Sequence, residues 1–530
     1  MTKVLKNKTK RMEKEMKKII ALLLVLVMSF CMFSCDIINK TPDNGGENNG
    51  GENNGNENNG GNETPAPEKV RYEVPAEGYD GSAVTIKFSH TMGQTLQTVL
   101  AEYIAVFNEK YPNITIETAS LGGYPDLRDQ IKQELTAGNQ PHIAYCYPDH
   151  VALYNLTKKV VPLDNFIESD IVIDEATGEI LGLTDEQIAN FIDGYYAEGT
   201  AFDAAGTMYT LPMSKSTEVL YYNKTFFDQY DLKVPTTWEE METVCEQIRA
   251  ILDNPANNYA NASISYPLGY DSEANWFITL CEQYGSNYTS ATGTKFLFNN
   301  AKNRAFVTEL REWYDKGYFT TEELFGGYTS DLFKNQDPEK GSIYMCIGSS
   351  AGAQYQVPST EDGLEGFEVG ITSIPQVNPS APKAISQGPS LCMFDHANKQ
   401  EVVASWLFVK FLTTTPEFQA QFSMVSGYIP VIEKDILIEA LPAYGTWLET
   451  GLLPGETVAT AKNIVISSTI STALAQADSY FVSPAFNGSS KARDVVGELM
   501  QYCFVTQADD INAMIEKAFK DAVAECVADA

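Results

Sequence analysis

Short β-rich runs alternate with longer helical segments in the chain after residue 82. Residues 83–88 alternate apolar and polar side chains, which predicts a strand, and residues 96–111 repeat apolar side chains at helical spacing. Strand, helix and strand signals recur at residues 114–117, 126–137 and 143–147. This alternation is typical of a parallel α/β sheet, whose ligands bind beyond the carboxyl ends of the strands. We therefore expect binding segments at residues 90–93, 122–124 and 147–150.

A second series of helices and strands begins near Tyr222. Thr236 or Thr237 predicts the start of one helix, and Gly317 predicts the end of another. The expected helices cover residues 238–252, 301–316, 400–412 and 491–501, and the expected strands cover residues 342–347, 367–371 and 384–394. We expect an α/β protein with two lobes, a hinge near Tyr222 and Ser386, and a ligand cleft between the lobes. The first lobe is expected at residues 71–222 and about 388–440, and the second at residues 223–387 and about 441–530.

The first 35 residues resemble the signal peptide of a bacterial lipoprotein. Three lysines at residues 14–18 precede an apolar run at residues 19–30, and Ser34 and Cys35 follow. The run is too short for a permanent membrane-spanning helix, which needs roughly 20 residues. Cleavage after Ser34 would leave Cys35 at the N-terminus, where it resembles the lipid acceptor of lipoproteins. We expect Cys35 to hold the protein at the outer face of the cell membrane, with ordinary secretion as the alternative.

Residues 36–70 are expected to form a flexible tether. The stretch from Thr41 to Pro67 consists almost entirely of Asn, Gly, Glu, Pro and Thr, and it contains two copies of Gly-Glu-Asn-Asn-Gly. Such a composition cannot bury enough apolar surface to offset the entropy lost on ordering. The folded body is therefore expected to begin near Arg71.

The charge and the reactive side chains exclude several classes of function. The chain carries a net charge of −33, and its first 35 residues carry +6, so the remainder is at −39. This charge disfavours nucleic acid as a partner. The sequence has only four histidines, with no two at metal-ligand spacing, and it lacks the usual zinc-hydrolase, phosphate-loop and serine-hydrolase motifs. We expect no metal, no cofactor and no enzymatic activity.

Seven cysteines follow Cys35, and they are widely spaced and odd in number. A disulfide framework would show an even number at close spacing in a short chain. We therefore expect most of them to be reduced and buried.

Aromatic side chains point to a carbohydrate as the ligand. The chain has 28 Tyr, 26 Phe and 5 Trp, and many of them must belong to the core. Sugar rings have weakly apolar faces and edges rich in hydroxyl groups, so sugar sites combine aromatic stacking with hydrogen bonds. The aromatic residues in polar or glycine-rich loops are the candidates for stacking: Tyr124, Tyr147, Tyr270, Trp276 and Tyr428.

Several segments in order resemble the family 1 extracellular solute-binding proteins of ABC importers. The most specific are YTLP at residues 209–212, VLYYNK at 219–224 and PTTWEE at 235–240, followed by SGYIPV at 426–431. The resemblance implies a two-lobed binding protein that captures a small hydrophilic solute, acts as a monomer, and delivers the solute to ABC permease subunits.

Within that family the chain resembles the glycerol-3-phosphate-binding subgroup. The resemblance implies that the following residues line the cleft: Tyr124, Asp149, Ser216, Tyr270, Trp276, Ser349, Gly388, Tyr428 and Arg493. Three positions depart from the subgroup. Asp149 lies one place later than the subgroup's acidic residue, Tyr270 replaces a tryptophan, and Gln387-Gly388-Pro389 replaces a Gly-Gly pair. Because of these departures, the resemblance does not identify the ligand.

The role of Arg493 distinguishes a phosphate ligand from a sugar ligand. A guanidinium is a natural bidentate partner of a phosphate, but in a sugar site it would bond hydroxyl groups, or it would pair with Asp494 or Glu498. We expect a carbohydrate as the ligand, with glycerol-3-phosphate or a related phosphodiester as the alternative. The rival classes of function are a lipid-anchored glycan-degrading enzyme, which would need two carboxylates across the cleft, and a surface adhesin.

Overall fold

The computed structural model describes residues 67–529 except residues 258, 260–261, 336–340 and 361–365. The predicted signal peptide with Cys35 lies outside the described residues, as does nearly all of the predicted tether. Within the described part, no helix has the length and apolar character needed to cross a membrane.

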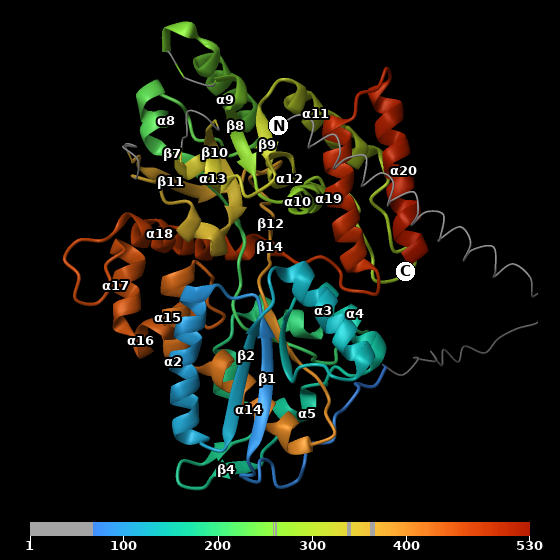
Figure 1. Cartoon of the computed structure of the whole chain (residues 1–530), viewed down its shortest axis with the longest axis vertical. Coiled ribbons are helices and arrows are strands. Elements are labelled where there is room, and N and C mark those ends of the chain that lie inside the picture. Colours follow the sequence, from blue (N-terminus) through green and yellow to red (C-terminus); the bar gives the residue numbers. More distant parts are fainter. Residues whose placement is uncertain (1–66, 258, 260–261, 336–340, 361–365, 530) are drawn as a thin grey trace, which may run out of the picture. The chain divides into compact units, whose positions relative to one another are not determined.

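Two five-stranded sheets organise the chain, and we call the half built on each sheet the first and the second lobe (Figure 1). The first sheet has the order β2 (Ile114–Ser120), β1 (Val84–His90), β3 (Ile143–Cys146), β13 (Ser390–Met393) and β6 (Leu211–Pro212). The second sheet has the order β11 (Val369–Ser373), β7 (Glu218–Asn223), β10 (Ile343–Ser349), β8 (Tyr266–Tyr270) and β9 (Phe319–Thr321).

The first sheet is parallel only in part. Strand β1 runs parallel to β2 and β3, as predicted, but β13 is antiparallel to both β3 and β6. The prediction of a parallel sheet was wrong for β13 because this strand returns from the second lobe rather than through a helix of its own lobe. The single strand signal at residues 384–394 is in fact two strands, β12 (Ala384–Ile385) and β13, which lie in different sheets.

Helices cover both sheets, and their ends follow the capping residues in the sequence. Helix α3 (Tyr124–Ala137) ends at Gly138, which adopts φ 76° and donates its backbone N–H to Glu134 O. Helix α9 (Trp238–Asp253) begins after Thr237, whose side chain accepts from the backbone N–H of Glu240. The other long helices are α2 (Gln94–Lys110), α10 (Glu273–Gln283), α11 (Ala301–Asp315), α14 (Lys399–Thr414), α15 (Pro416–Ser426), α18 (Ala461–Ala475), α19 (Ser489–Val505) and α20 (Ile511–Asp529).

The buried apolar side chains form two core clusters. The first includes Phe88, Phe107 and Trp406 around the first sheet and extends to β7 and β10 of the second sheet. The second includes Trp276, Trp313 and Phe519 beside the second sheet. The seven cysteines beyond Cys35 are all free and buried, which confirms the prediction that most are reduced.

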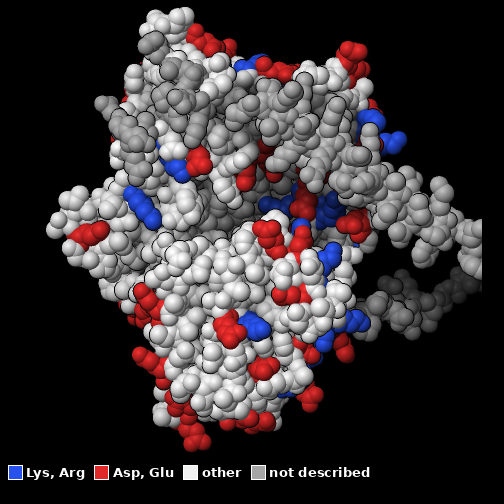
Figure 2. All heavy atoms as spheres, in the orientation of Figure 1, with Lys and Arg blue, Asp and Glu red and all other residues white. Residues whose placement is uncertain are grey.

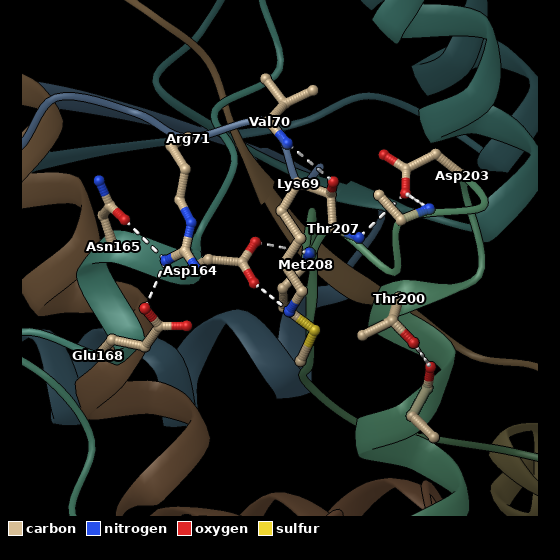
Figure 3. A network of polar contacts seen from close by, with 12 residues as sticks. Lys69, Val70, Arg71, Asp164, Asn165, Glu168, Thr200, Asp203, Thr207 and Met208 are labelled. Atoms are coloured by element: carbon tan, nitrogen blue, oxygen red, sulfur yellow. Dashed lines mark hydrogen bonds and ion pairs between the residues drawn. The ribbon is translucent and has the colours of Figure 1, made fainter. Parts of the chain in front are cut away.

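The segment that leads into the body is fastened to the first lobe (Figure 3). Lys69 pairs with Asp164 at 2.6 Å, and Arg71 pairs with Glu168 and also donates to Asn165. Asp164, which begins α5 (Asp164–Ile167), also accepts from the backbone N–H of Met208 at 2.9 Å. The backbone N–H of Val70 donates to Thr207 Oγ1 at 3.2 Å, so three consecutive residues, Lys69 to Arg71, fix the point at which the chain enters the first lobe.

Candidate ligand-binding site

Three segments of the chain pass between the lobes and are bonded to one another. Ser216, between β6 and β7, exchanges two backbone hydrogen bonds with Gln387, at 2.8 and 2.9 Å. Ser386 N donates to Phe481 O at 2.8 Å, and β12 pairs with β14 (Tyr480–Phe481). Tyr222, where we expected a hinge, lies inside β7 and is paired on both sides. The first crossing therefore precedes Tyr222, near Ser216.

A small pocket of about 60 Å³ lies against these crossings. The first lobe contributes residues at the end of β3 and the start of α4 (Pro148–Tyr154), and the second lobe contributes residues of α10 and α19. The lining residues are Tyr147, Pro148, Asp149, Glu198, Ile278, Tyr288, Ile385, Ser386, Gln387, Gly388, Val482, Ser483, Pro484, Ser489 and Arg493. Three predicted site residues, Asp149, Gly388 and Arg493, thus meet at this pocket.

Three tyrosines contact one another in the first lobe, and one of them, Tyr147, lines the pocket. The rings of Tyr124 and Tyr147 are stacked, with their centroids 4.2 Å apart, and the hydroxyls of Tyr124 and Tyr428 are 3.2 Å apart. Tyr147 and Tyr124 follow β3 and β2, as the rule for the carboxyl ends of strands predicts. The structure therefore brings Tyr124 and Tyr428 together with the pocket residue Tyr147.

On the side of the second lobe, Arg493 is held by a buried polar network. Its guanidinium donates to Asn275 Oδ1. The amide nitrogen of Asn275 donates to Glu218 Oε1 and to Gln387 Oε1, both at 2.9 Å. Glu218 also accepts from the Tyr270 hydroxyl at 2.6 Å. Because both ends of the Asn275 amide are bonded, its oxygen is fixed toward Arg493.

Glu218 is a carboxyl with an unusual proton affinity. Burial raises its pKa from 4.5 to about 7, against the opposing effect of its bonds from Tyr270 and Asn275. The folded state therefore holds a proton that the unfolded chain releases above pH 4.5. The stability that this proton contributes is fully present below pH 4.5 and is lost as the pH rises to about 7.

This linkage predicts the pH dependence of a Glu218→Gln variant. The stability of the wild type relative to the variant should fall by roughly 3 kcal/mol between pH 4.5 and pH 7.5. Urea unfolding of both proteins at the two pH values measures this difference, and changes due to other groups cancel. A wild-type-to-variant difference that is the same at both pH values would contradict the prediction.

A buried ion pair supports the first crossing. Lys215 Nζ lies 2.6 Å from Glu198 Oε1 and donates to Ser390 Oγ at 3.0 Å, and the two charged side chains are 0% and 3% exposed. Glu198 also lines the pocket. The pair therefore joins the pocket wall to the strand β13 and to the crossing at Lys215.

A second ion pair joins the two lobes beside the pocket. Arg128 on α3 donates to Asp494 Oδ2 at 2.9 Å and to Ser490 Oγ at 2.8 Å, both on α19. Acidic and basic side chains gather in the hollow between the lobes in Figure 2. Asp494, which we considered as a partner of Arg493, is instead bonded to Arg128.

The other predicted site residues lie deeper or serve the backbone. Trp276 and Tyr270 are 0% exposed, and their rings stack at 4.6 Å within the second core. Tyr270 reaches the network only through its hydroxyl. Ser216 lies in the first crossing, and Ser349 caps the short helix η5 (Ser350–Tyr355) by accepting from Ala351 N. These four residues do not line the pocket beside the crossings.

Five residues of the site and its supporting contacts were not predicted from the sequence: Glu198, Lys215, Glu218, Asn275 and Arg128. Lys215 and Glu218 carried a usable signal, because they are charged residues within the otherwise apolar and β-rich segment 208–223. Charged side chains are almost never fully buried unless they are paired. Asn275 and Arg128 carried no such signal, since their partners lie more than 50 residues away in the chain.

Two histidines that are distant in the sequence meet in the first lobe. The rings of His142 and His396 are stacked at 3.8 Å with 13° between their planes, and His142 Nε2 lies 3.2 Å from Glu401. His142 Nδ1 accepts from the backbone N–H of Lys87, so its Nε2 carries the proton and donates to Glu401. Parallel rings do not direct their lone pairs at a common point. The cluster is thus arranged for hydrogen bonding rather than for a metal ion.

The chain is similar in sequence to known solute-binding proteins. The sequence profile of the bacterial extracellular solute-binding protein family matches residues 102–443. The sn-glycerol-3-phosphate-binding periplasmic protein UgpB of Escherichia coli strain K12 is 24% identical over 357 residues, which cover 66% of this chain and 75% of that protein.

Solved structures with this fold include binders of different ligands. UgpB from Mycobacterium tuberculosis, in complex with glycerophosphocholine, aligns with a TM-score of 0.62 and 15% identity over 84% of this chain and 98% of that chain. An ABC substrate-binding protein from Listeria monocytogenes, in complex with cycloalternan, aligns with a TM-score of 0.61 and 16% identity over 83% and 97%. These likenesses confirm the predicted two-lobed α/β fold.

Proposed function

Since this chain belongs to the bacterial extracellular solute-binding protein family, we propose that it captures a carbohydrate between its lobes for an ABC importer. The observation that carries the proposal is the composition of the cleft. Tyr124, Tyr147 and Tyr428 offer aromatic surface and hydroxyl groups on one side, and Arg493 offers hydrogen-bond donors on the other. This combination suits a ring with apolar faces and hydroxyl edges.

In this proposal the protein acts by lobe closure, and no covalent bond is made or broken. The solute binds at the crossings, the lobes rotate about them, and the closed form is presented to the permease. The ion pair between Arg128 and Asp494 stabilises the closed form because its two members belong to different lobes. The protein works outside the cytoplasm as a monomer, and lipidated Cys35 holds it at the membrane.

A phosphodiester, such as a glycerol-3-phosphate derivative, is the second candidate ligand. Arg493 lines the pocket, and no ion pair among the described residues involves it. A phosphate could accept two N–H bonds from this guanidinium, which forms no ion pair with a described carboxylate. The same cleft residues would then bind the glycerol hydroxyls.

A ligand panel on the purified full-length protein tests the proposal. Thermal shift and calorimetry with monosaccharides, oligosaccharides, glycerol-3-phosphate and glycerophosphocholine should show saturable stabilisation by a carbohydrate. Binding of a phosphodiester alone would favour the second candidate. Release of reducing ends from any oligosaccharide would contradict the proposal in favour of a glycan-degrading enzyme.

Replacing Arg128 with Ala tests the mechanism of closure. The variant should bind the same ligand about three- to tenfold more weakly, because a partly exposed pair that stabilises only the closed form is lost. Calorimetry measures the affinity, and small-angle scattering should show a smaller contraction of the variant at subsaturating ligand. Arg249→Ala removes a comparable pair, with Asp253, within one helix and should leave the affinity unchanged. Equal affinities of wild type and Arg128→Ala would argue against the closure role of this pair.

A further inference from the structure

Two aromatic side chains of the second lobe are unusually exposed. Tyr328 is 61% exposed and Tyr355 is 56% exposed, the highest values for aromatic residues in the described part of the chain. A large ring left in water forgoes the free energy that burial would contribute, which is on the order of 1.5–3 kcal/mol. Exposed aromatic rings that lie together are therefore typical of binding surfaces.

The backbone that carries each ring is firmly held. Tyr328 lies between α12 (Glu322–Phe325) and α13 (Ser330–Asn335), and the next residue, Thr329, is fully buried. The backbone N–H and the hydroxyl of Thr329 donate to Asp271 Oδ1 at 2.7 and 2.6 Å. The rings are thus presented to solvent from ordered positions.

Tyr355 is held in the same way. It ends η5, and the following Gln356 is 2% exposed and donates to the sulfur of Cys346 at 3.3 Å. Neither Tyr328 nor Tyr355 therefore owes its exposure to a loose segment.

Both rings lie where the second lobe meets Tyr428 of the first lobe. Gly427 packs so closely on η5 that an added Cβ would lie 2.3 Å from Ser350 O and 3.0 Å from Ala353 Cβ. Thr329, which follows Tyr328, and Gln356, which follows Tyr355, both contact the sulfur of Cys346, at 3.5 and 3.3 Å, so the two exposed tyrosines lie on neighbouring stretches of backbone. A row of tyrosines therefore continues from Tyr147 at the pocket, through Tyr124 and Tyr428, to these exposed rings.

We propose that Tyr328 and Tyr355 form an outer subsite that stacks on the second or third ring of an oligosaccharide whose first ring lies beside Tyr147 and Arg493. The inference rests on the proposed function and extends it from a carbohydrate to a ligand longer than one ring. Each tyrosine presents an apolar face with a polar tip, and successive sugar rings offer apolar faces at successive positions along the row. A single sugar ring at the pocket would leave the exposed pair without a partner.

The test compares ligands of increasing length on the full-length protein. Calorimetry is performed with glucose to maltotetraose and with xylose to xylotetraose, on the wild type and on Tyr328→Ala/Tyr355→Ala. The double variant should bind the trisaccharide and the tetrasaccharide of the preferred series at least about tenfold more weakly. It should bind the monosaccharide, or the shortest saccharide that the wild type binds, within about twofold of wild type.

Two control variants separate stacking from other effects. Tyr328→Phe/Tyr355→Phe keeps both rings and should retain most of the affinity for the longer ligands. Tyr502→Ala removes a ring that is 50% exposed on α19 and should change no affinity. All variants should melt close to the wild-type temperature, because the removed rings contribute little to the core.

The outcomes separate the outer subsite from the proposed function. If the wild type binds saccharides but the double variant loses none of its affinity, or loses it equally for all lengths, the outer subsite is wrong and the proposed function stands. If glycerophosphocholine binding alone is lost in the double variant, the rings hold a cationic group and the carbohydrate assignment of the subsite is overturned. If the wild type binds no saccharide, the proposed function fails, and the outer subsite fails with it.

Discussion

Replacing Lys215 with Met should lower the free energy of unfolding by about 3–5 kcal/mol. The substitution would leave the Glu198 carboxylate buried at the pocket without the ammonium that lies 2.6 Å away. Removing one member of a buried pair costs far more than the pair itself contributes, because the remaining charge has lost water and gained no partner. Urea unfolding followed by circular dichroism measures the change.

Two comparisons make the Lys215 result interpretable. The double variant Lys215→Met/Glu198→Leu should recover most of the loss, because neither charge remains. Lys399→Met removes an exposed pair with Asp395 and should cost less than about 1 kcal/mol. A Lys215→Met variant no less stable than Lys399→Met would show that Glu198 is not effectively buried.

The second large effect is expected from Gly388→Ala. Gly388 adopts φ +99°, and an added Cβ would lie 2.7 Å from Lys215 Cα and 2.8 Å from Ser214 O. The methyl group would meet backbone atoms of the first crossing, which cannot rotate away as a side chain can. We expect a loss of about 2–4 kcal/mol in unfolding free energy and a weaker ligand affinity, because the pocket wall must shift.

Gly138→Ala is the matched control for Gly388→Ala. Gly138 also has a positive φ, of 76°, but nothing lies within 4 Å of its added Cβ. It should therefore show only the backbone strain, of about 1 kcal/mol. Equal losses in the two variants would mean that the close approach of the two crossings at Gly388 does not constrain the fold.

Local sequence patterns predicted the helices and strands well, because their causes are local. The predicted cap at Thr236 or Thr237 agrees with the start of α9 after Thr237, and the predicted helix at residues 126–137 ends where α3 ends. The direction of β13 could not be predicted in this way. It depends on the path through the second lobe, which no short segment encodes.

Residues of the candidate site were predictable only where they lie at the carboxyl ends of strands or match the motifs of the resembled family. Tyr124 meets Tyr147 after the ends of parallel strands, as expected, and Tyr428 joins them. Trp276 fitted the pattern of a stacking residue, but it lies in the core beside Tyr270. The local sequence does not show which face of α10 packs against the core. Asn275, rather than Trp276, lies on the face that contacts Arg493.

The fastening of Lys69 to Arg71 onto the first lobe determines how a mechanical load would travel through the protein. Tension applied through the preceding chain would pass into α5 and, through Tyr72 and Asp395, into the turn before α14. None of these contacts involves the crossings at Ser216 or Gln387. A pull on the N-terminal side would therefore be borne by contacts within the first lobe, away from the crossings about which we propose that the lobes rotate.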